Sequence, residues 1–180
     1  MDKQLGKLPV IAEDLGTITP EVEELRDDLQ YPGMKILLFA FNSSADSPYL
    51  PQNFSKNCVV YTGTHDNDTA VGWFFNPDIA LEVKKRAKKY ANKNDIEAAS
   101  FHHDIVYLAQ SSVACLSIMP LQDILGFGND CRMNTPGTTS GNWTWRCAAS
   151  FLSNEIAEKL HKDTALYGRI PVREKDGYIP

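Results

Sequence analysis

With 180 residues, the chain is long enough for one folded unit with a sizeable core. Its formal net charge of −5 argues against a nucleic-acid-binding protein, because such proteins usually carry a basic face. No apolar stretch approaches the roughly 20 residues of a membrane span, and the polar N-terminus lacks the apolar centre of a signal peptide. The four cysteines form no C-x-x-C pair, which favours reduced thiols in a cytoplasmic protein over a disulfide framework or a zinc site.

The chain begins with two short apolar segments that are typical of buried strands. The first, residues 8–12, ends at Glu13 and Asp14 and would deliver two carboxylates at its carboxyl end. The second, residues 34–41, has a length that suits a buried strand better than a helix. Both segments therefore predict strands of one sheet.

A helix is predicted between these two strands. Thr19 is a favourable N-cap, and Pro20 suits the first helical position because its missing N–H would have no partner there. Apolar residues then recur at helical spacing and would form one face of the helix: Val22, Leu25 and Leu29.

The most informative stretch follows a long polar loop at residues 42–57. Residues 59–62 form a β-branched and aromatic run that predicts a strand buried on both faces. The chain then passes through Gly63 into a dense polar cluster. In parallel α/β folds the carboxyl ends of the strands form the rim where active sites are built. The cluster contains His65, Asp66, Asn67 and Asp68.

Helices dominate the rest of the chain. One is predicted to start near residues 76–78, with Ile79, Val83, Ala87 and Tyr90 on one face. The other expected elements are a helix capped by Asp95 and running to about Gln110, a strand at 113–119, a glycine- and asparagine-rich segment at 126–142, and a helix at about 154–160.

Strands separated by helices in this way are most simply parallel. The order therefore predicts an α/β fold with about four parallel strands, equivalent to the C-terminal half of a TIM-type (β/α)8 barrel. A complete barrel typically needs ~250 residues. We accordingly expect residues 1–180 to form a single partial catalytic-barrel domain without a second domain.

Carboxylates at two strand ends suggest chemistry on glycosidic bonds, which commonly needs two carboxyl groups across a sugar. Glu13 and Asp66 are the two candidates, and barrel geometry could bring them to the same rim. A metal site at His65, Asp66 and Asp68 is also possible in composition. Trp143 and Trp145 are expected to pack rather than to stack on sugars.

Five sequence motifs, in order, closely resemble the amylomaltase family, the 4-α-glucanotransferases or disproportionating enzymes. The resemblance covers nearly the whole chain. The motifs are IAEDLGTITPEV at 11–22, PGMK at 32–35, YTGTHDNDT at 61–69, RMNTPGT at 132–138 and GNWTWR at 141–146.

This resemblance implies a barrel of the α-amylase type that acts with retention through a covalent glycosyl-enzyme. Glu13 matches the general acid/base, and Asp66 matches the carboxylate that grips sugar hydroxyls in the oxocarbenium-like transition state. His65 matches a hydrogen-bonding neighbour at that sugar, Asn134 falls in a substrate-contacting loop, and Phe39 could face a glucose ring. The implied substrates are maltooligosaccharides or α-1,4-glucan, with no organic cofactor and no metal.

The family's nucleophile is an aspartate on a strand that precedes every motif found here. We therefore expect no nucleophile in this chain, no transferase activity from it alone, and association either with an N-terminal barrel half or with itself. Two other functions stay open: a non-catalytic glucan-binding remnant or half-barrel partner subunit, and a hydrolase of α-glucans in which water replaces the acceptor sugar.

Overall fold

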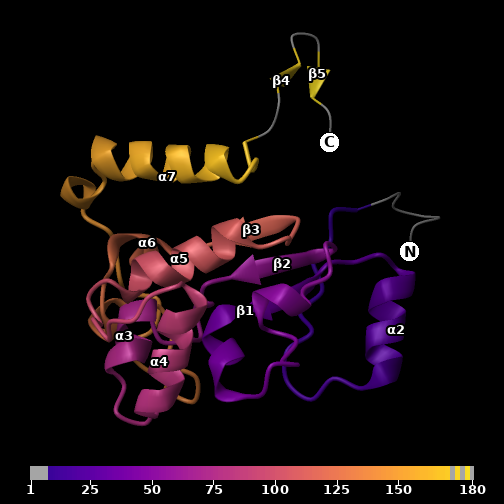
Figure 1. Cartoon of the computed structure of the whole chain (residues 1–180), viewed down its shortest axis with the longest axis horizontal. Coiled ribbons are helices and arrows are strands. Elements are labelled where there is room, and N and C mark those ends of the chain that lie inside the picture. The colour runs from indigo at the N-terminus through magenta and orange to yellow at the C-terminus, as the bar shows by residue number, and fades with distance from the viewer. Residues whose placement is uncertain (1–7, 171–172, 175–176, 179–180) are drawn as a thin grey trace.

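The computed structural model describes residues 8–170, 173–174 and 177–178. At its centre lies a three-stranded parallel sheet with the order β1-β2-β3, which confirms the predicted parallel pairing (Figure 1). Val59 pairs with Met34 on one side and with Leu116 on the other. The strands are β1 (Gly33–Ile36), β2 (Cys58–Tyr61) and β3 (Leu116–Ile118), and a separate antiparallel pair is formed by β4 (Arg173–Glu174) and β5 (Gly177–Tyr178).

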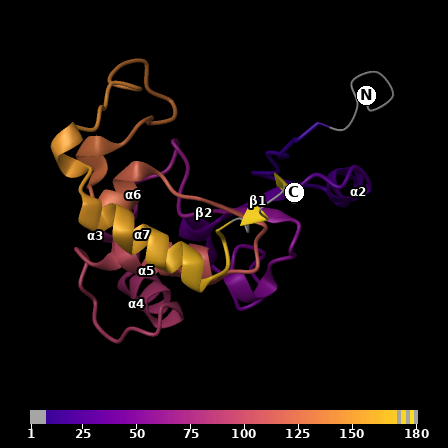
Figure 2. The same ribbon diagram turned by 90° about the horizontal axis from the view of Figure 1, so that it is seen from above.

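Helices α3, α4 and α5 lie together beside the sheet, whereas α2 lies apart from them on the other side (Figures 1 and 2). In the described ranges, no helix combines the length and the apolar character required to cross a membrane. The α-helices are α2 (Pro20–Asp28), α3 (Ala70–Phe75), α4 (Leu81–Tyr90), α5 (Phe101–Ser111), α6 (Leu121–Leu125) and α7 (Asn154–Leu166). Short 3-10 turns are η1 (Leu37–Asn42), η2 (Pro51–Asn53), η3 (Asn129–Cys131) and η4 (Ala149–Phe151).

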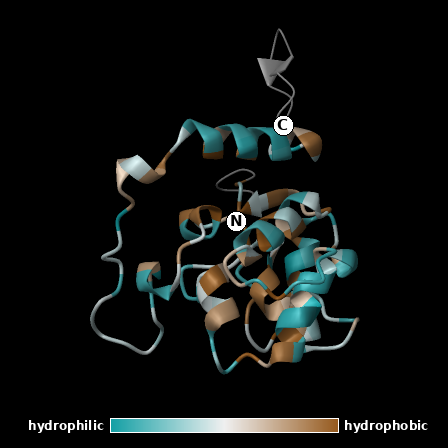
Figure 3. Cartoon of the chain, turned by 60° about the vertical axis from the view of Figure 1, so that its left-hand side comes forward, coloured by the Kyte–Doolittle hydropathy of each residue, from teal (hydrophilic) through white to brown (hydrophobic). Residues whose placement is uncertain are grey.

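The core is built from the sheet, η1 and the three neighbouring helices, and its centre is aromatic. Trp73 stacks on Phe101 with ring centroids 5.4 Å apart, and the ring of Phe41 is tilted against that of Trp73 with centroids 6.1 Å apart. Ile105 and Leu108 of α5 are buried in this core. Hydrophobic residues concentrate in this region, whereas α7 is mostly hydrophilic (Figure 3).

Two predicted strands are wrong in part or in whole. Residues 8–12 form no strand, because their link to the sheet is one hydrogen bond from Ala12 N to Pro32 O (2.9 Å), while Val10 N donates to Leu8 O. The run at 34–41 is a strand only to Ile36 and then winds into η1. This turn buries Leu37, Leu38, Ala40 and Phe41, and a largely apolar run does not distinguish a strand from such a turn.

The remaining differences are in helix bounds and in strand length. The helix expected from Asp95 begins only at Phe101, because the Asp95 carboxylate is held by the buried Lys88 Nζ at 2.7 Å instead of capping a helix. The last helix extends to Leu166, and the strand expected at 113–119 is limited to β3. Helices α3 and α6 were not predicted, since five or six residues are too few to show a helical period.

Helix α2 forms where it was predicted, with Pro20 in the first turn, although the Thr19 side chain makes no capping hydrogen bond. Its apolar stripe is not buried. Val22, Leu25 and Leu29 are 45%, 60% and 45% exposed. Residues 1–7, on which the expectation about a signal peptide partly rests, lie outside the described residues.

Candidate active site

The turn between β2 and α3 presents His65 and Asp66 at its tip. Asn67 shapes this turn, because its Oδ1 accepts hydrogen bonds from Thr64 N (2.8 Å) and Thr64 Oγ1 (2.9 Å). Asn67 N in turn donates to Thr64 O at 3.2 Å. Such side-chain bonds to the local backbone favour tight turns over continued secondary structure. His65 and Asp66 remain about half exposed, at 52% and 47% of their side-chain surface.

The base of the turn is fixed by the buried carboxylate of Asp123 on α6. Thr62 Oγ1 donates to Asp123 Oδ2 at 2.5 Å, and Ala70 N donates to Asp123 Oδ1 at 2.7 Å. Burial raises the pKa of Asp123, which these two hydrogen bonds partly offset. Thr69 completes the junction as the N-cap of α3, since its hydroxyl accepts from Gly72 N at 3.0 Å.

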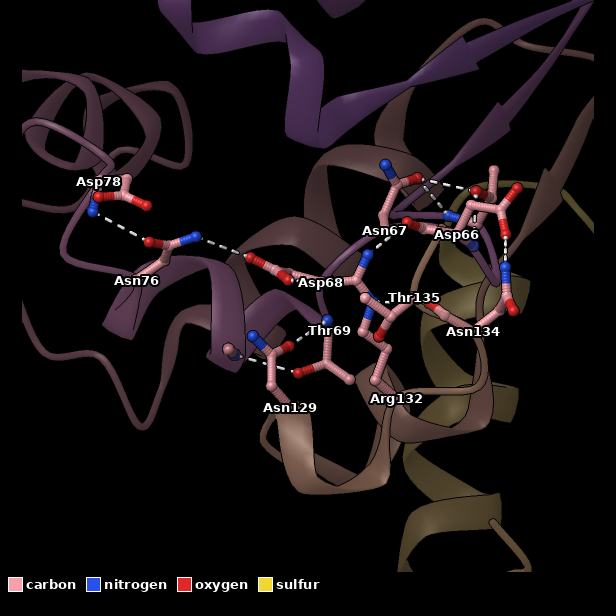
Figure 4. A network of polar contacts seen from close by, with 12 residues as sticks. Asp66, Asn67, Asp68, Thr69, Asn76, Asp78, Asn129, Arg132, Asn134 and Thr135 are labelled. Atoms are coloured by element: carbon pink, nitrogen blue, oxygen red, sulfur yellow. Dashed lines mark hydrogen bonds and ion pairs between the residues drawn. The ribbon is translucent and has the colours of Figure 1, made fainter. Parts of the chain in front are cut away.

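A second loop carries Asn134 to the tip of this turn (Figure 4). The Asn134 side chain donates to Asp66 Oδ1 at 2.5 Å, and its backbone N donates to His65 O at 3.1 Å. His65 Nε2 lies 3.3 Å from the same Asp66 oxygen. Among the described residues, no hydrogen bond to Asp66 Oδ2 is made, so this oxygen is free to accept from a ligand hydroxyl.

Arg132, which the sequence did not single out, connects the two loops. Its guanidinium contacts the Asp68 carboxylate at 2.5 Å, Asp66 O at 2.6 Å and Asn134 O at 2.8 Å (Figure 4). Asp68 is held from its other oxygen by Asn76 Nδ2 at 3.0 Å. Asp68 therefore anchors the side chain of Arg132. From the sequence, Asp68 was a possible metal ligand.

Glu13 is positioned by its neighbour, Asp14. The Asp14 carboxylate accepts from Met34 N at 2.6 Å and pairs with Arg26 at 2.5 Å, so it ties the segment to both β1 and α2. Gly33 is required by this close approach, because a Cβ there would lie 2.2 Å from Asp14 Oδ2. Although residues 8–12 are not a strand, Asp14 places Glu13 beside the start of β1.

The structure brings Glu13 and Asp66 to one cavity of about 480 Å³. Its floor includes Tyr61 at the end of β2 and Ile118 at the end of β3, which are paired in the sheet. Burial, and then the nearby negative charge of Glu13, raise the pKa of Tyr61. The cavity therefore lies at the carboxyl ends of the parallel strands, where a barrel carries its active site.

Apart from Tyr61, the aromatic residues considered from the sequence do not line this cavity. Phe39 is 40% exposed and packs edge-on against Tyr49 at 5.5 Å, and it does not line the cavity. Trp145 packs edge-on against Phe127, as expected for a packing residue. Trp143 is 53% exposed, with its ring 5.0 Å from that of His65, so it contributes an open aromatic surface at the rim.

Two carboxylates beside one cavity, with amide and imidazole donors fixed at its edge, suit proton transfer and charge stabilisation on a neutral polar ligand. Among the described residues, no three His, Cys, Asp or Glu side chains cluster closely enough to hold a metal ion. The possible metal trio of His65, Asp66 and Asp68 is instead divided, because Asp68 points to Arg132 and Asn76.

The family model and the relatives that match this chain carry the same description. The glycoside hydrolase 77 family model, described as 4-alpha-glucanotransferase, matches residues 1–152. A 4-alpha-glucanotransferase of Synechocystis sp. is 52% identical over 171 residues, which cover 94% of this chain and 33% of that protein. A chloroplastic/amyloplastic 4-alpha-glucanotransferase of Solanum tuberosum is 46% identical over 169 residues, covering 92% of this chain and 29% of that protein.

Solved structures show the same fold. An amylomaltase from Streptococcus agalactiae, solved in complex with acarbose, superimposes with a TM-score of 0.86 at 35% identity, covering 93% of this chain and 33% of that one. An amylomaltase from Corynebacterium glutamicum matches with a TM-score of 0.65 at 22% identity and supports the fold alone. The chain spans about a third of the length of the relatives it matches.

Proposed function

The chain belongs to the 4-alpha-glucanotransferase family, glycoside hydrolase family 77, and from this premise we propose that it supplies part of the active site of an amylomaltase. The reaction would transfer α-1,4-glucan segments between maltooligosaccharides by a retaining double displacement. The observation that carries the proposal is the shared cavity of Glu13 and Asp66 at the strand ends. Residues 1–180 would form one partial barrel domain in this scheme.

Glu13 acts as the general acid/base. It protonates the leaving glycosidic oxygen in the first step and removes the proton from the incoming 4-hydroxyl in the second. The group must exchange protons with a ligand, so it needs an open side chain on a fixed backbone. Glu13 has both, because it is exposed while Asp14 beside it is hydrogen-bonded to Met34 N.

Asp66 stabilises the developing positive charge, and its Oδ2 accepts hydrogen bonds from sugar hydroxyls. A fixed anion at that place lowers the barrier without reacting itself. Asn134 holds Asp66 Oδ1, and His65 beside them offers a further contact to the sugar. Phe39, which follows β1 and is partly exposed, offers an aromatic face to a more distant glucose unit.

The nucleophile would come from a part of the family's barrel that these 180 residues do not contain. The relatives are about three times longer than the matched region, which leaves length for an N-terminal barrel part in a complete enzyme. Alternatively, a second copy of this chain would cover the open side of the sheet. The scheme uses no cofactor, and the free thiols suit a reducing, cytoplasmic compartment.

A chimera tests the proposed function. The part of this chain that aligns with the Synechocystis relative replaces the matching third of that protein, and the purified chimera is incubated with maltotriose. Glucose together with longer oligomers is expected, because the transferase passes each glucan segment to another sugar. Glu13→Gln in the chimera should reduce turnover by about 10²–10⁴-fold, the usual contribution of general acid/base catalysis.

Glu24→Gln is the matched control, since Glu24 is an exposed glutamate on α2. It should leave the rate unchanged. A folded chimera without transfer, or a Glu13→Gln chimera with nearly full transfer, would contradict the proposal. Shortening of maltotriose without longer products would indicate a hydrolase instead.

A further inference from the structure

Arg132 lies between the two loops that carry the candidate sugar-binding groups, and it touches both. Nε donates to Asn134 O at 2.8 Å, and Nη2 donates to Asp66 O at 2.6 Å. The third contact, from Nη1 to Asp68 Oδ1, is an ion pair in which the side chains are only 20% and 14% exposed. One side chain thus fixes the backbone of Asp66 and of Asn134 relative to each other.

The anchor for this side chain is itself fixed. Asp68 Oδ2 accepts from Asn76 Nδ2 at 3.0 Å, and Asn76 is the C-cap residue of α3 (Figure 4). The sequence of contacts therefore runs from the end of α3 through Asp68 and Arg132 to Asn134. At its end, Asn134 Nδ2 donates to Asp66 Oδ1, which leaves Asp66 Oδ2 unpaired among the described residues.

Asn134 O, Asp68 Oδ1 and Asp66 O each accept from a different nitrogen of Arg132, so a side chain with several separate donors is needed. Guanidinium presents five N–H donors in a rigid plane, whereas the ammonium of lysine is a compact point charge on a flexible chain. A lysine at 132 could keep the ion pair with Asp68. It could not also reach Asp66 O and Asn134 O in the arrangement that Nε and Nη2 provide.

We propose that Arg132 is a positioning residue of the active site, which acts by holding the Asp66 turn and the Asn134 loop in register. This proposal rests on the proposed function, because the relative position of the two loops matters for catalysis only if Asp66 faces a sugar. Arg132 does not line the cavity that Glu13 and Asp66 share, although with His65 it lines a neighbouring cavity. The role assigned to it rests on its hydrogen bonds to Asp66 O and Asn134 O.

Two measurements on the whole 180-residue chain test the positioning itself. In the wild type, the backbone N–H of Asn134 is bonded to His65 O, so its hydrogen exchange should be slow. Arg132→Lys should accelerate that exchange by roughly tenfold and shift the NMR signal of the Asn134 side-chain amide. Exchange of the β2 amides should stay unchanged, which separates a local release from general loosening.

The matched control is Arg86→Lys on α4, where the guanidinium donates to Ser43 O and lies over the Tyr90 ring, away from both loops. It should leave the Asn134 signals unaltered. If Arg132→Lys fails to fold, Asp68→Asn removes the charge that pairs with Arg132 and one of the two acceptor oxygens of Asp68, and it should give the same accelerated exchange. Unchanged Asn134 exchange in the folded variant would overturn the proposal.

Kinetics of the chimera distinguish a positioning role from a merely structural one. Arg132→Lys should lower kcat by about 10²-fold while KM changes by less than about threefold, because misplacement of a charge-stabilising group affects the transition state most. A loosened Asn134 loop with a normal kcat would overturn the positioning role. An inactive wild-type chimera would refute the proposed function, while the exchange data would still decide whether Arg132 fixes the two loops.

Discussion

The helix-covered side of the sheet and the N-terminal region, residues 8–31, differ in how far they are stabilised within the chain. On the covered side, Phe41 and Phe101 are 1% and 0% exposed, and Lys88 is buried against Asp104 at 2.6 Å. In the N-terminal region Leu8, Ile11 and Leu25 are 41%, 40% and 60% exposed. A cavity of about 600 Å³ lies between residues 8–11 and 28–32.

This contrast shows where the fold is complete and where it depends on further surface. Apolar side chains stabilise a protein in proportion to the area they remove from water, so the exposed stripe of α2 contributes little in this chain. The same stripe on a barrel would be available for packing against neighbouring elements. Glu13 belongs to the less stabilised region and Asp66 to the better stabilised one, so the candidate site lies on their boundary.

The largest expected effect comes from emptying the aromatic core. Phe101→Ala should lower the free energy of unfolding by about 3–5 kcal/mol, because the cavity left beneath Trp73 cannot close fully. Phe75→Ala is the matched control, since Phe75 is 66% exposed, and should cost no more than about 0.5 kcal/mol. Urea unfolding followed by circular dichroism measures both. Equal costs would show that the core does not determine stability.

A smaller effect is expected at the connection between the two regions. Asp14→Ala removes the acceptor of Met34 N and the partner of Arg26, and should cost about 2 kcal/mol. Hydrogen exchange should accelerate at Met34 while the amides of α5 keep their protection. Asp28→Ala, at an exposed position on α2, provides the control. If the α5 amides lose protection as well, the two regions unfold as one unit and the contrast is wrong.

The covered side should also respond to acid. Burial, and then the charge of His103, lower the pKa of His102 to about 4. The unfolded chain would bind this proton near the ordinary value of 6.5, so stability should fall as the pH drops from about 6.5 toward about 4.

The size should be about 1–2 kcal/mol, less than the full shift implies, because the ring keeps partial contact with solvent. Lys159 and Asp104 face the same pair of rings with opposite charges, so their effects partly cancel. Thermal unfolding of His102→Gln between pH 4 and 7 should show a flatter profile than the wild type. His161→Gln, at an exposed position of α7, should keep the wild-type profile; a His102→Gln profile as steep as the wild type would exclude this histidine as the cause.

Features that depend on residues close together in the sequence were mostly predictable. Contacts between residues far apart in the sequence were not. Strand β2 was recognisable because a β-branched run ends in a polar cluster, and this also identified His65 and Asp66. Asn134 came from the family resemblance. The roles of Arg132 and Asp14 were not predictable, since their partners are 64 and 20 residues away in sequence.

The strand expected at 8–12 was wrong for a related reason. Apolar composition indicates that a segment can be buried, but a strand also requires a continuous ladder of hydrogen bonds with a neighbour. Here the described ladder consists of one bond from Ala12 to Pro32. The segment is held to β1 through the Asp14 side chain instead of through a backbone ladder, and Glu13 lines a cavity with Tyr61 and Ile118, which lie at the ends of β2 and β3.

The smallest effect on stability is expected for a substitution in the exposed apolar stripe of α2. It tests most directly whether the N-terminal region is less stabilised than the covered side. Leu25→Gln should change the free energy of unfolding by less than about 0.5 kcal/mol, because this side chain is already 60% exposed. It should nevertheless reduce self-association, since contiguous exposed apolar surface promotes contact between copies. Light scattering over a range of concentrations measures this, with Glu24→Gln on the same helix as the control. If Leu25→Gln lowered stability as much as Asp14→Ala, the stripe would be packed within the chain in solution, and the N-terminal region would be stabilised much as the covered side is.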